Sequence, residues 1–215
     1  MSSKRTQVAR ILREALSAEM DEFMDQHGFR RRVNSLKYSR RLPAVDQVLD
    51  FAFDLSPRYE PDAVAHLLPD MTVSMHEVNR IATDMAGSHA PLPPDMTGTI
   101  WQQIHSAAPK AQTGNARWFI YNPDSAFDCV IAIRSFVERW VIPVFDEYSS
   151  VESLVAVYEN NDPRIVRQRH TYLYIAAAYL LMGQRNKARE VLEAKLGQRR
   201  PRKEFAKAFE YVGIA

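Results

Sequence analysis

Residues 45–55, with the sequence VDQVLDFAFDL, constrain the fold more than any other segment of this chain. Apolar side chains alternate here with polar or small ones, and successive side chains of a β-strand point to opposite faces of the sheet. The pattern therefore predicts a strand that packs one face on a core. We expect Phe51 and Phe53 to share the buried face, and Asp50 and Asp54 to lie on the other.

The residues before this strand predict a helix and a β-hairpin. Apolar side chains recur at spacings of three and four over residues 4–27, which is typical of an amphipathic helix. Gly28 follows at the position where a left-handed residue commonly ends a helix. Residues 35–40 alternate as a second strand, and we expect a turn at 42–44 to join it to the strand at 45–55.

The remaining segments predict a smaller number of strands and a helical C-terminal region. We expect strands at 70–76 and 118–121, helices at 99–107, 124–143, 150–158 and 203–212, and a helical hairpin at 164–197 that turns at Gly183. Residues 84–116 otherwise lose periodicity. The expected fold class is α+β, with a small, mostly antiparallel sheet packed on helices. We expect two parts, an α+β domain at 1–163 and a helical hairpin with a tail at 164–215, packed on the first.

Composition narrows the class of protein. The chain has 215 residues, of which 46% are hydrophobic and 25% charged, close to the average of globular domains and unlike disordered or collagen-like chains. Cys129 is the single cysteine, so no intramolecular disulfide can form, which fits a reducing compartment. The N-terminus lacks the apolar core of a signal peptide, and the apolar stretch 172–182 is about half a membrane span. We therefore expect a soluble, cytoplasmic protein.

Charge is distributed unevenly along the chain. Residues 1–60 carry 11 Lys and Arg against 9 Asp and Glu, residues 61–163 carry 5 against 13, and residues 164–215 carry 12 against 4. The net charges are +2, −8 and +8, which add to the +2 of the whole chain. Either the basic tail packs near the acidic middle, or each segment presents its own field to a partner.

Two resemblances follow from particular motifs. The run 172–196 (YLYIAAAYLLMGQRNKAREVLEAKL) is similar to a single tetratricopeptide-type helical pair, with Gly183 at the turn and Ala188 at the packing position. Only one such unit is visible, and a repeat array needs about three units to bury a core. The resemblance therefore implies a mode of helix packing and no solenoid.

The order of elements over roughly residues 5–160 resembles an uncharacterised bacterial family of domains of unknown function, the forty-three-zero-four type. The matching segments are Gly28-Phe29-Arg30, Leu36-Lys37-Tyr38, Val48–Phe53, Trp140–Tyr148 (WVIPVFDEY) and Ser150–Leu154. The family carries no established catalytic residues, so the resemblance assigns none. Some small proteins of this sort are similar to immunity proteins that neutralise bacterial toxins, and the resemblance implies such a role here.

The usual signatures of catalytic chemistry are missing from the sequence. No two of the six histidines stand four residues apart, and neither HExxH nor a cysteine pair occurs, so we expect no metal site. Cys129 lies on an expected buried helix, where a structural role is the usual one. No GxSxG elbow and no phosphate-binding glycine loop is present, so we expect no cofactor and no enzymatic activity. Paired carboxylates occur at Asp50/Asp54 and at Asp146-Glu147. We interpret the first pair as the solvent-exposed surface of a sheet, and a hydrolytic pair would need long-range geometry that the sequence does not show.

Three functions remain open, and the first is a non-enzymatic protein-binding module, such as an immunity protein that inhibits a toxin. Its expected interface is acidic, drawn from residues 84–105 and 146–152, with Asp95, Trp101, His105, Asp146, Glu147 and Glu152 as candidates. The alternative is an RNA- or DNA-associated protein, because basic strands that carry aromatics can follow a phosphate backbone. Its candidates are Arg30, Arg31, Arg32, Lys37, Arg40 and Arg41, with a second basic run at 198–203. An unrecognised enzyme is the third possibility.

Overall fold

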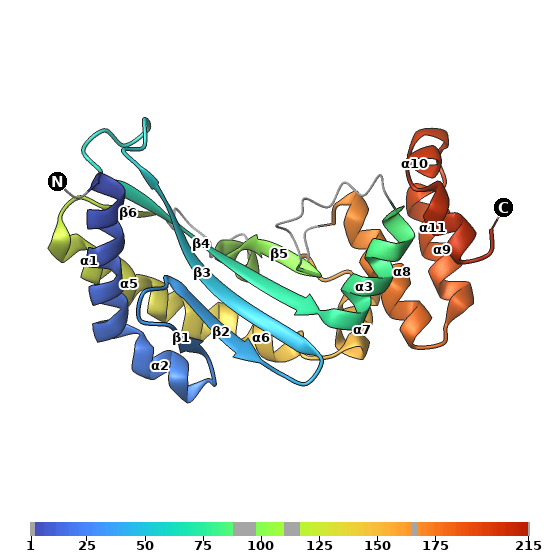
Figure 1. The fold of residues 1–215 in the computed structure, drawn as a ribbon, viewed down its shortest axis with the longest axis horizontal. Helices are drawn as coiled ribbons and strands as arrows, with labels where there is room; N and C mark the ends of the chain where they lie inside the picture. Colours follow the sequence, from blue (N-terminus) through green and yellow to red (C-terminus); the bar gives the residue numbers. More distant parts are fainter. Residues whose placement is uncertain (1–2, 88–97, 110–116, 165–166, 215) are drawn as a thin grey trace. The chain divides into compact units, whose positions relative to one another are not determined.

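The computed structural model describes residues 3–87, 98–109, 117–164 and 167–214. The described chain is α+β, as the sequence predicts, with a six-stranded, mostly antiparallel sheet and a helical C-terminal region (Figure 1). It divides into two compact units. Unit 1 comprises residues 1–41, 47–71 and 102–146, and unit 2 comprises 42–46, 72–101 and 147–215. The expected boundary between residues 163 and 164 lies within unit 2.

The sheet is built from strands that follow one another in the chain. Its order is β1-β2-β3-β4-β5, and β6 pairs with β4 in antiparallel fashion. The strands are β1 (Arg30–Arg31), β2 (Lys37–Arg41), β3 (Val45–Leu55), β4 (Ala65–Met75), β5 (Ile100–Gln103) and β6 (Trp118–Ile120). In β3, burial alternates along the strand: Phe51 and Phe53 are buried, and Asp50 and Asp54 lie on the other face, which confirms the expected alternation.

The pairing of β3 with β4 fixes which residues stand opposite one another. The Ser56 amide donates to the Val64 carbonyl oxygen (3.0 Å) at one end of the pair. The His76 amide donates to the Ala44 carbonyl oxygen (3.2 Å) at the other end, in the same register. Counting inward from either bond places Asp54 opposite His66 and Asp50 opposite Asp70.

Helices of unit 1 pack on the buried face of the sheet. They are α1 (Lys4–Glu19), α2 (Asp21–Gln26), α5 (Pro123–Phe136), the π-helical turn Val137–Val141 and α6 (Ile142–Glu147). The Gln47 amide of β3 donates to the Phe145 carbonyl oxygen, and the Phe29 and Phe145 rings lie 5.0 Å apart. Gly28 has a φ of 78° after α2, the left-handed ending that the sequence predicts.

Unit 2 is mainly helical. Its helices are α3 (His76–Ala86), α7 (Val151–Glu159), α8 (Arg169–Leu181), α9 (Arg185–Leu196), α10 (Arg199–Glu204) and α11 (Ala206–Tyr211). The predicted hairpin of α8 and α9 is present, and it turns at Gly183 with a φ of 71°. Ala176, Ala177 and Ala188 are fully buried in this pair, consistent with close helix approach. None of the described helices is long and apolar enough to cross a membrane.

Several elements of the structure differ from those expected. The expected helix at 99–107 is wrong: residues 100–103 form β5, and a 3₁₀ turn follows at Ile104–Ala107. Ile100 and Gln102 are buried while Trp101 is exposed, so the period is that of a strand. The strand expected at 70–76 begins earlier, at Ala65, and runs through Pro69. The residues of β4 that pair with β6 end at Leu67. Pro69 lies beyond this pairing, so the missing N–H of Pro69 removes no hydrogen bond between β4 and β6.

A further difference is α3, a helix that the sequence analysis does not predict. Its buried residues are Val78, Ile81, Ala82 and Met85, at helical spacing, so the periodic signal is present in the sequence. The helix expected at 124–143 ends as α5 at Phe136 and continues through the π-helical turn into α6. Pro143 is the second residue of α6, which begins directly after the π-helical turn; a proline inside a continuous helix removes one backbone hydrogen bond, so a local change in helical hydrogen bonding is expected beside it.

Candidate interaction surfaces

Four aromatic side chains gather on unit 1 where β4 meets β6. We call Tyr59, His66, Phe119 and Tyr121 the aromatic patch. His66 and Phe119 are cross-strand partners in the β4–β6 pair, and Tyr121 follows Phe119 by two residues and so shares its side. Tyr59 comes from the loop that joins β3 to β4. The patch therefore results from strand register, which brings together residues about sixty positions apart.

The rings of the patch are held in contact with one another. The His66 and Phe119 ring centroids lie 4.6 Å apart, those of Tyr59 and His66 lie 5.7 Å apart, and those of Phe119 and Tyr121 lie 6.4 Å apart. The Tyr59 hydroxyl and His66 Nδ1 share a hydrogen bond of 2.6 Å. Tyr59 is nevertheless 57% exposed and Tyr121 43% exposed. Large aromatic surface held rigid and exposed is typical of interaction hot spots.

Carboxylates surround the aromatic patch. Asp54 lies opposite His66 across the β3–β4 pair and is exposed. Glu60 and Asp62 act on the Tyr121 hydroxyl, whose pKa is raised by burial first and then by these two carboxylates. Burial and the charge of Arg117 lower the pKa of His66, with Asp54 opposing them, which favours the neutral imidazole at neutral pH. The patch is thus aromatic at its centre and mainly acidic around it.

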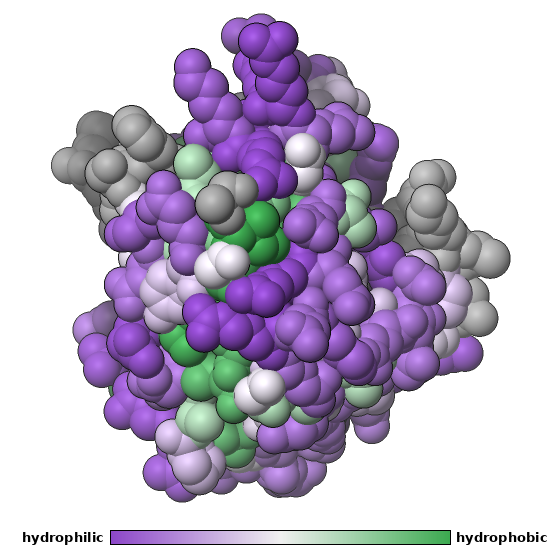
Figure 2. All heavy atoms as spheres, turned by 90° about the vertical axis from the view of Figure 1, so that its right-hand side faces the viewer, coloured by the Kyte–Doolittle hydropathy of each residue, from purple (hydrophilic) through white to green (hydrophobic). Residues whose placement is uncertain are grey.

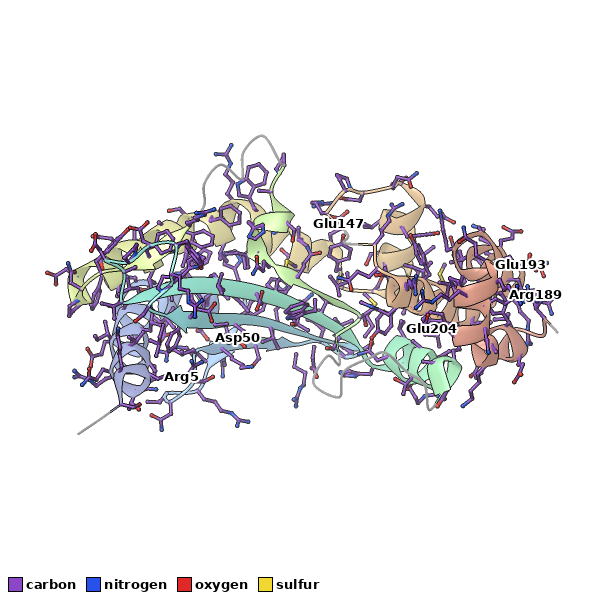
Figure 3. The ribbon with its side chains drawn as sticks, turned by 90° about the horizontal axis from the view of Figure 1, so that it is seen from above. Arg5, Asp50, Glu147, Arg189, Glu193 and Glu204 are labelled. Atoms are coloured by element: carbon purple, nitrogen blue, oxygen red, sulfur yellow. The ribbon has the colours of Figure 1, made fainter. Side chains whose placement is uncertain are left out.

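Charged side chains of β2, β3 and β4 also lie side by side on the face of the sheet that carries the aromatic patch. Lys37 of β2 pairs with Asp50 of β3 at 2.7 Å, and the register places Asp70 of β4 opposite Asp50. Figure 3 labels Asp50 on the sheet. Oδ1 of Asp70 is buried and has no hydrogen-bond partner among the described residues. Burial, and after it the charge of Asp50, raises the pKa of Asp70 to about 6. Lys37 neutralises Asp50 in part, whereas no cation of the described residues pairs with Asp70 on this face.

The residues expected to form an acidic interface are placed as follows. Asp95 lies outside the described residues. Trp101 is 47% exposed on β5, as expected, and His105 is exposed in the 3₁₀ turn. Glu152 is exposed in the first turn of α7, where backbone and Ser150 hydrogen bonds lower its pKa.

Two of these acids are neutralised within the chain. Asp146 accepts from Arg40 at 2.7 Å, and Glu147 accepts from Arg164 at 2.6 Å. Arg164 also pairs with Asp162, so one guanidinium serves two carboxylates. Part of the acidic middle of the chain is therefore compensated by the basic tail, in accordance with the first of the two interpretations of the charge asymmetry.

The six cations expected to contact nucleic acid are Arg30, Arg31, Arg32, Lys37, Arg40 and Arg41, and we call them the N-terminal basic stripe. Several of them have hydrogen-bond or ion-pair partners inside unit 1. Arg31 has a side chain only 5% exposed and donates to both carboxylate oxygens of Asp21, at 2.9 and 2.7 Å. Arg40 donates to Gln47, to the His27 carbonyl oxygen and to Asp146, and its guanidinium lies 4.7 Å from the centroid of the Phe29 ring. These two arginines hold the fold together and offer little to a partner.

The other members of the stripe are more accessible. Arg30 pairs at 3.3 Å with Asp25, but its side chain is 85% exposed. Lys37 is exposed and paired with Asp50, while Arg32 and Arg41 are exposed. The six expected nucleic-acid contacts therefore include two structural residues and four on the surface.

Groups that could support metal or thiol chemistry are scarce among the described residues. They include no cluster of three or more His, Cys, Asp or Glu that could hold a metal ion. The Cys129 thiol donates to the Phe119 carbonyl oxygen at 3.2 Å, and burial, then Asp128, raises its pKa to about 11. A thiol with this pKa is almost wholly protonated at neutral pH and is a poor nucleophile.

The aromatic patch is a surface that the sequence pattern does not predict. Phe119 and Tyr121 belong to the strand expected at 118–121, and the sequence analysis names neither as a candidate for an interface. The available signal is Tyr59, an aromatic residue in a loop bounded by Pro57 and Pro61. Comparisons of the chain with protein-family models, with curated proteins and with solved structures found no match. The geometry of these surfaces is therefore the basis on which a function can be inferred.

Proposed function

We propose that this chain is a non-enzymatic protein-binding module and that the aromatic patch is its binding surface. The supporting observation is the exposure of Tyr59 and Tyr121 in a cluster that ring contacts and the Tyr59–His66 hydrogen bond hold in place. Rigid aromatic side chains lose little conformational entropy on binding, which makes them effective anchors.

The partner that fits this surface is a basic protein. Asp54, Glu60 and Asp62 surround the patch, and Asp50 and Asp70 extend the acidic character along the sheet. Lys or Arg side chains of a partner could stack on the Tyr121 ring, as Arg117 of this chain does on the Tyr59 ring, 5.9 Å from its centroid, and could pair with these carboxylates. This surface replaces the expected one at 146–152, because Asp146 and Glu147 already have arginine partners.

Photo-crosslinking in cells of the source organism tests the proposal. A photoreactive phenylalanine analogue at Tyr59 or Tyr121 is expected to give one main protein adduct with a basic partner. The matched control is Tyr211, which is 38% exposed on α11 of unit 2. Equal adducts from all three positions, or no adduct from the patch, would contradict the proposal.

Binding measurements with the purified partner then provide the quantitative test. Truncating a hot-spot aromatic costs roughly 2 kcal/mol or more, which corresponds to about a thirtyfold weaker Kd. We expect this loss for Tyr59→Ala and Tyr121→Ala, and less than about a twofold change for Tyr211→Ala. Asp54→Asn should mainly slow association, and by less at high salt, because a charge at the rim acts through steering.

Residues 5–160 resemble an uncharacterised bacterial domain family, and some small proteins of this sort are similar to immunity proteins. From this we further propose that the partner is a toxin and that the chain neutralises it. The specific test is co-expression of the chain with a candidate toxin encoded beside it. Cells should survive with the unchanged chain and die with the Tyr59→Ala/Tyr121→Ala variant at equal protein level. Death with both would count against inhibition of that toxin and leave the crosslinking result to be judged separately.

A further inference from the structure

The C-terminal helices of unit 2 contain an unusual excess of cations. Residues 164–215 hold 12 Lys and Arg against 4 Asp and Glu. The face of unit 2 that carries these helices is mainly hydrophilic (Figure 2). What a partner could bind depends on which of these cations are already engaged within the chain.

Most of the twelve cations have a structural partner. Arg164, Arg169 and Lys187 form ion pairs with acids, and Arg167 donates to the Asn161 side chain. Arg185 and Arg189 donate to carbonyl oxygens at the end of α11. Lys195 and Arg202 lie over aromatic rings, those of Tyr172 and Phe209.

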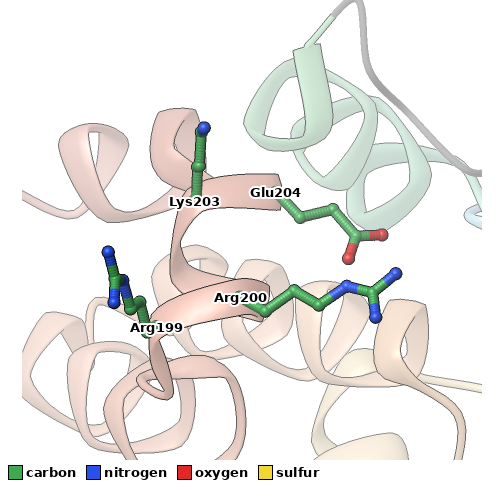
Figure 4. Close-up of a pocket in the computed structure, with 4 residues that line it drawn as sticks. All are labelled: Arg199, Arg200, Lys203 and Glu204. Atoms are coloured by element: carbon green, nitrogen blue, oxygen red, sulfur yellow. The ribbon is translucent and has the colours of Figure 1, made fainter.

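Four cations remain, of which Lys207 lies on α11 and the other three lie together on α10. Arg199, Arg200 and Lys203 are exposed and make no ion pair, side-chain hydrogen bond or ring contact with the described residues. Together with Glu204 they line an open depression of about 610 Å³ (Figure 4). Glu204 is the one acid in this lining, and it already pairs with Arg169 at 3.0 Å. The depression therefore carries close to three uncompensated positive charges.

The spacing on α10 concentrates this charge. Arg199 and Lys203 are four residues apart and extend to the same side of the helix, away from Arg200 and Glu204 (Figure 4). Two like charges at this spacing repel each other and destabilise a helix. An anion that bridges the two side chains would remove that repulsion. Arginine guanidinium groups also match the geometry of phosphate oxygens and can bind them in bidentate fashion.

We propose that the depression on α10 is a binding site for the phosphate backbone of a nucleic acid. This site is separate from the aromatic patch, and its proposal is independent of the protein-binding function. A phosphate chain fits better than a single phosphate, because Arg200 points away from the Arg199–Lys203 pair and would contact a neighbouring phosphate. The site lies in the run 198–203, whereas Arg31 and Arg40 of the stripe at 30–41 already have partners inside unit 1.

The experiment compares two triple variants with the same change in net charge. Arg199→Gln/Arg200→Gln/Lys203→Gln removes the proposed contacts, and Arg30→Gln/Arg32→Gln/Lys37→Gln removes three cations of the N-terminal stripe. None of the residues of α10 is buried, so the first variant should fold, which circular dichroism and thermal unfolding check. Fluorescence anisotropy then measures binding of labelled single-stranded RNA and duplex DNA at several salt concentrations.

We expect the unchanged chain to bind both nucleic acids without sequence preference, with a Kd of roughly 10⁻⁶–10⁻⁴ M at physiological salt. Each lost phosphate contact lowers the slope of log K against log salt by about 0.7 for a single strand, so the α10 variant should lose about 2 units of slope. The stripe variant should keep most of its slope.

Three results would overturn the proposal. The first is no binding of either nucleic acid by the unchanged chain at low salt. The second is an equal loss in both variants, which would mean that net charge alone accounts for binding. The third is competition by inorganic tripolyphosphate at the same concentration of phosphate groups as RNA, which would assign the depression to small polyphosphates.

Discussion

The pKa of Asp70 is raised in the folded protein, whereas folding lowers the pKa of most carboxylates. The predicted dependence of stability on pH therefore has the opposite sign. The pKa of Asp70 is raised from 3.8 to about 6, by burial first and by the Asp50 charge second. The folded state therefore binds a proton more tightly than the unfolded chain does. Its contribution to stability should be greatest below about pH 4, fall as the pH rises from about 4 to 6, and level off above that range. Asp70→Asn removes this ionisation and should stabilise the protein at neutral pH.

The magnitude follows from the shift in pKa. A difference of about 2 pKa units corresponds to about 3 kcal/mol, at about 1.36 kcal/mol per unit. Asp70 is only partly buried, so solvent screens part of this energy and we expect about 1 kcal/mol. Urea unfolding at pH 8 should therefore show Asp70→Asn more stable than the unchanged chain by this amount, and the gain should shrink toward zero at pH 4.

Asp54→Asn is the matched control, because Asp54 is an exposed carboxylate on the same face of the sheet. Its effect on the free energy of unfolding should lie within about 0.5 kcal/mol at both pH values. A destabilised Asp70→Asn at pH 8, or a gain that is the same at pH 4 and pH 8, would refute the reasoning. Either result would mean that the carboxylate is solvated, or paired, in the folded protein.

Three further predictions concern the stability of the fold. Phe51→Ala should lower the free energy of unfolding by roughly 3–5 kcal/mol in urea, because Phe51 is fully buried; a loss below about 1 kcal/mol would show that it is not in the core. Asp21→Ala should cost roughly 1–3 kcal/mol by leaving Arg31 buried without its carboxylate. Burial raises the pKa of Asp21, but the hydrogen bonds from Arg31 and Tyr38 outweigh it and lower that pKa, so the difference from the unchanged chain should shrink as the pH falls below 3.8 and the carboxylate becomes protonated. Ser150→Ala should cost about 1 kcal/mol because the Ser150 hydroxyl accepts from the Ser153 amide at the start of α7, and an unchanged thermal midpoint would contradict this.

Much of the architecture could be predicted because it rests on local patterns. The alternation in β3, the helical spacing in α1 and the Gly183 turn each depend on residues a few positions apart. The helix expected at 99–107 is wrong because the conformation of this segment depends on distant residues. A strand of four residues, Ile100–Gln103, is too short for its period to be recognised in the sequence, and its pairing with a neighbouring strand decides its conformation.

The candidate surfaces were less predictable than the fold. Trp101 was expected to be exposed and is exposed. The sequence also indicated two basic runs but contained no sign of which one was engaged. Arg40 and Asp146 are 106 positions apart, and their ion pair removes one residue from each of the two expected interfaces. The free cations of α10 could be recognised only after the partners of the others were known.

The buried and exposed faces of the elements follow from the amino-acid sequence alone, since the 2-residue and 3.6-residue periods of side chains are properties of the local backbone. The sequence thereby predicts that Phe51 is buried and that Asp50 does not share its face. The tertiary structure decided which polar side chains are neutralised and which remain available. Asp50 meets Lys37 and Asp70, and His66 meets Phe119, because strand register places them opposite one another. Register depends on the packing of distant segments, which no local pattern records.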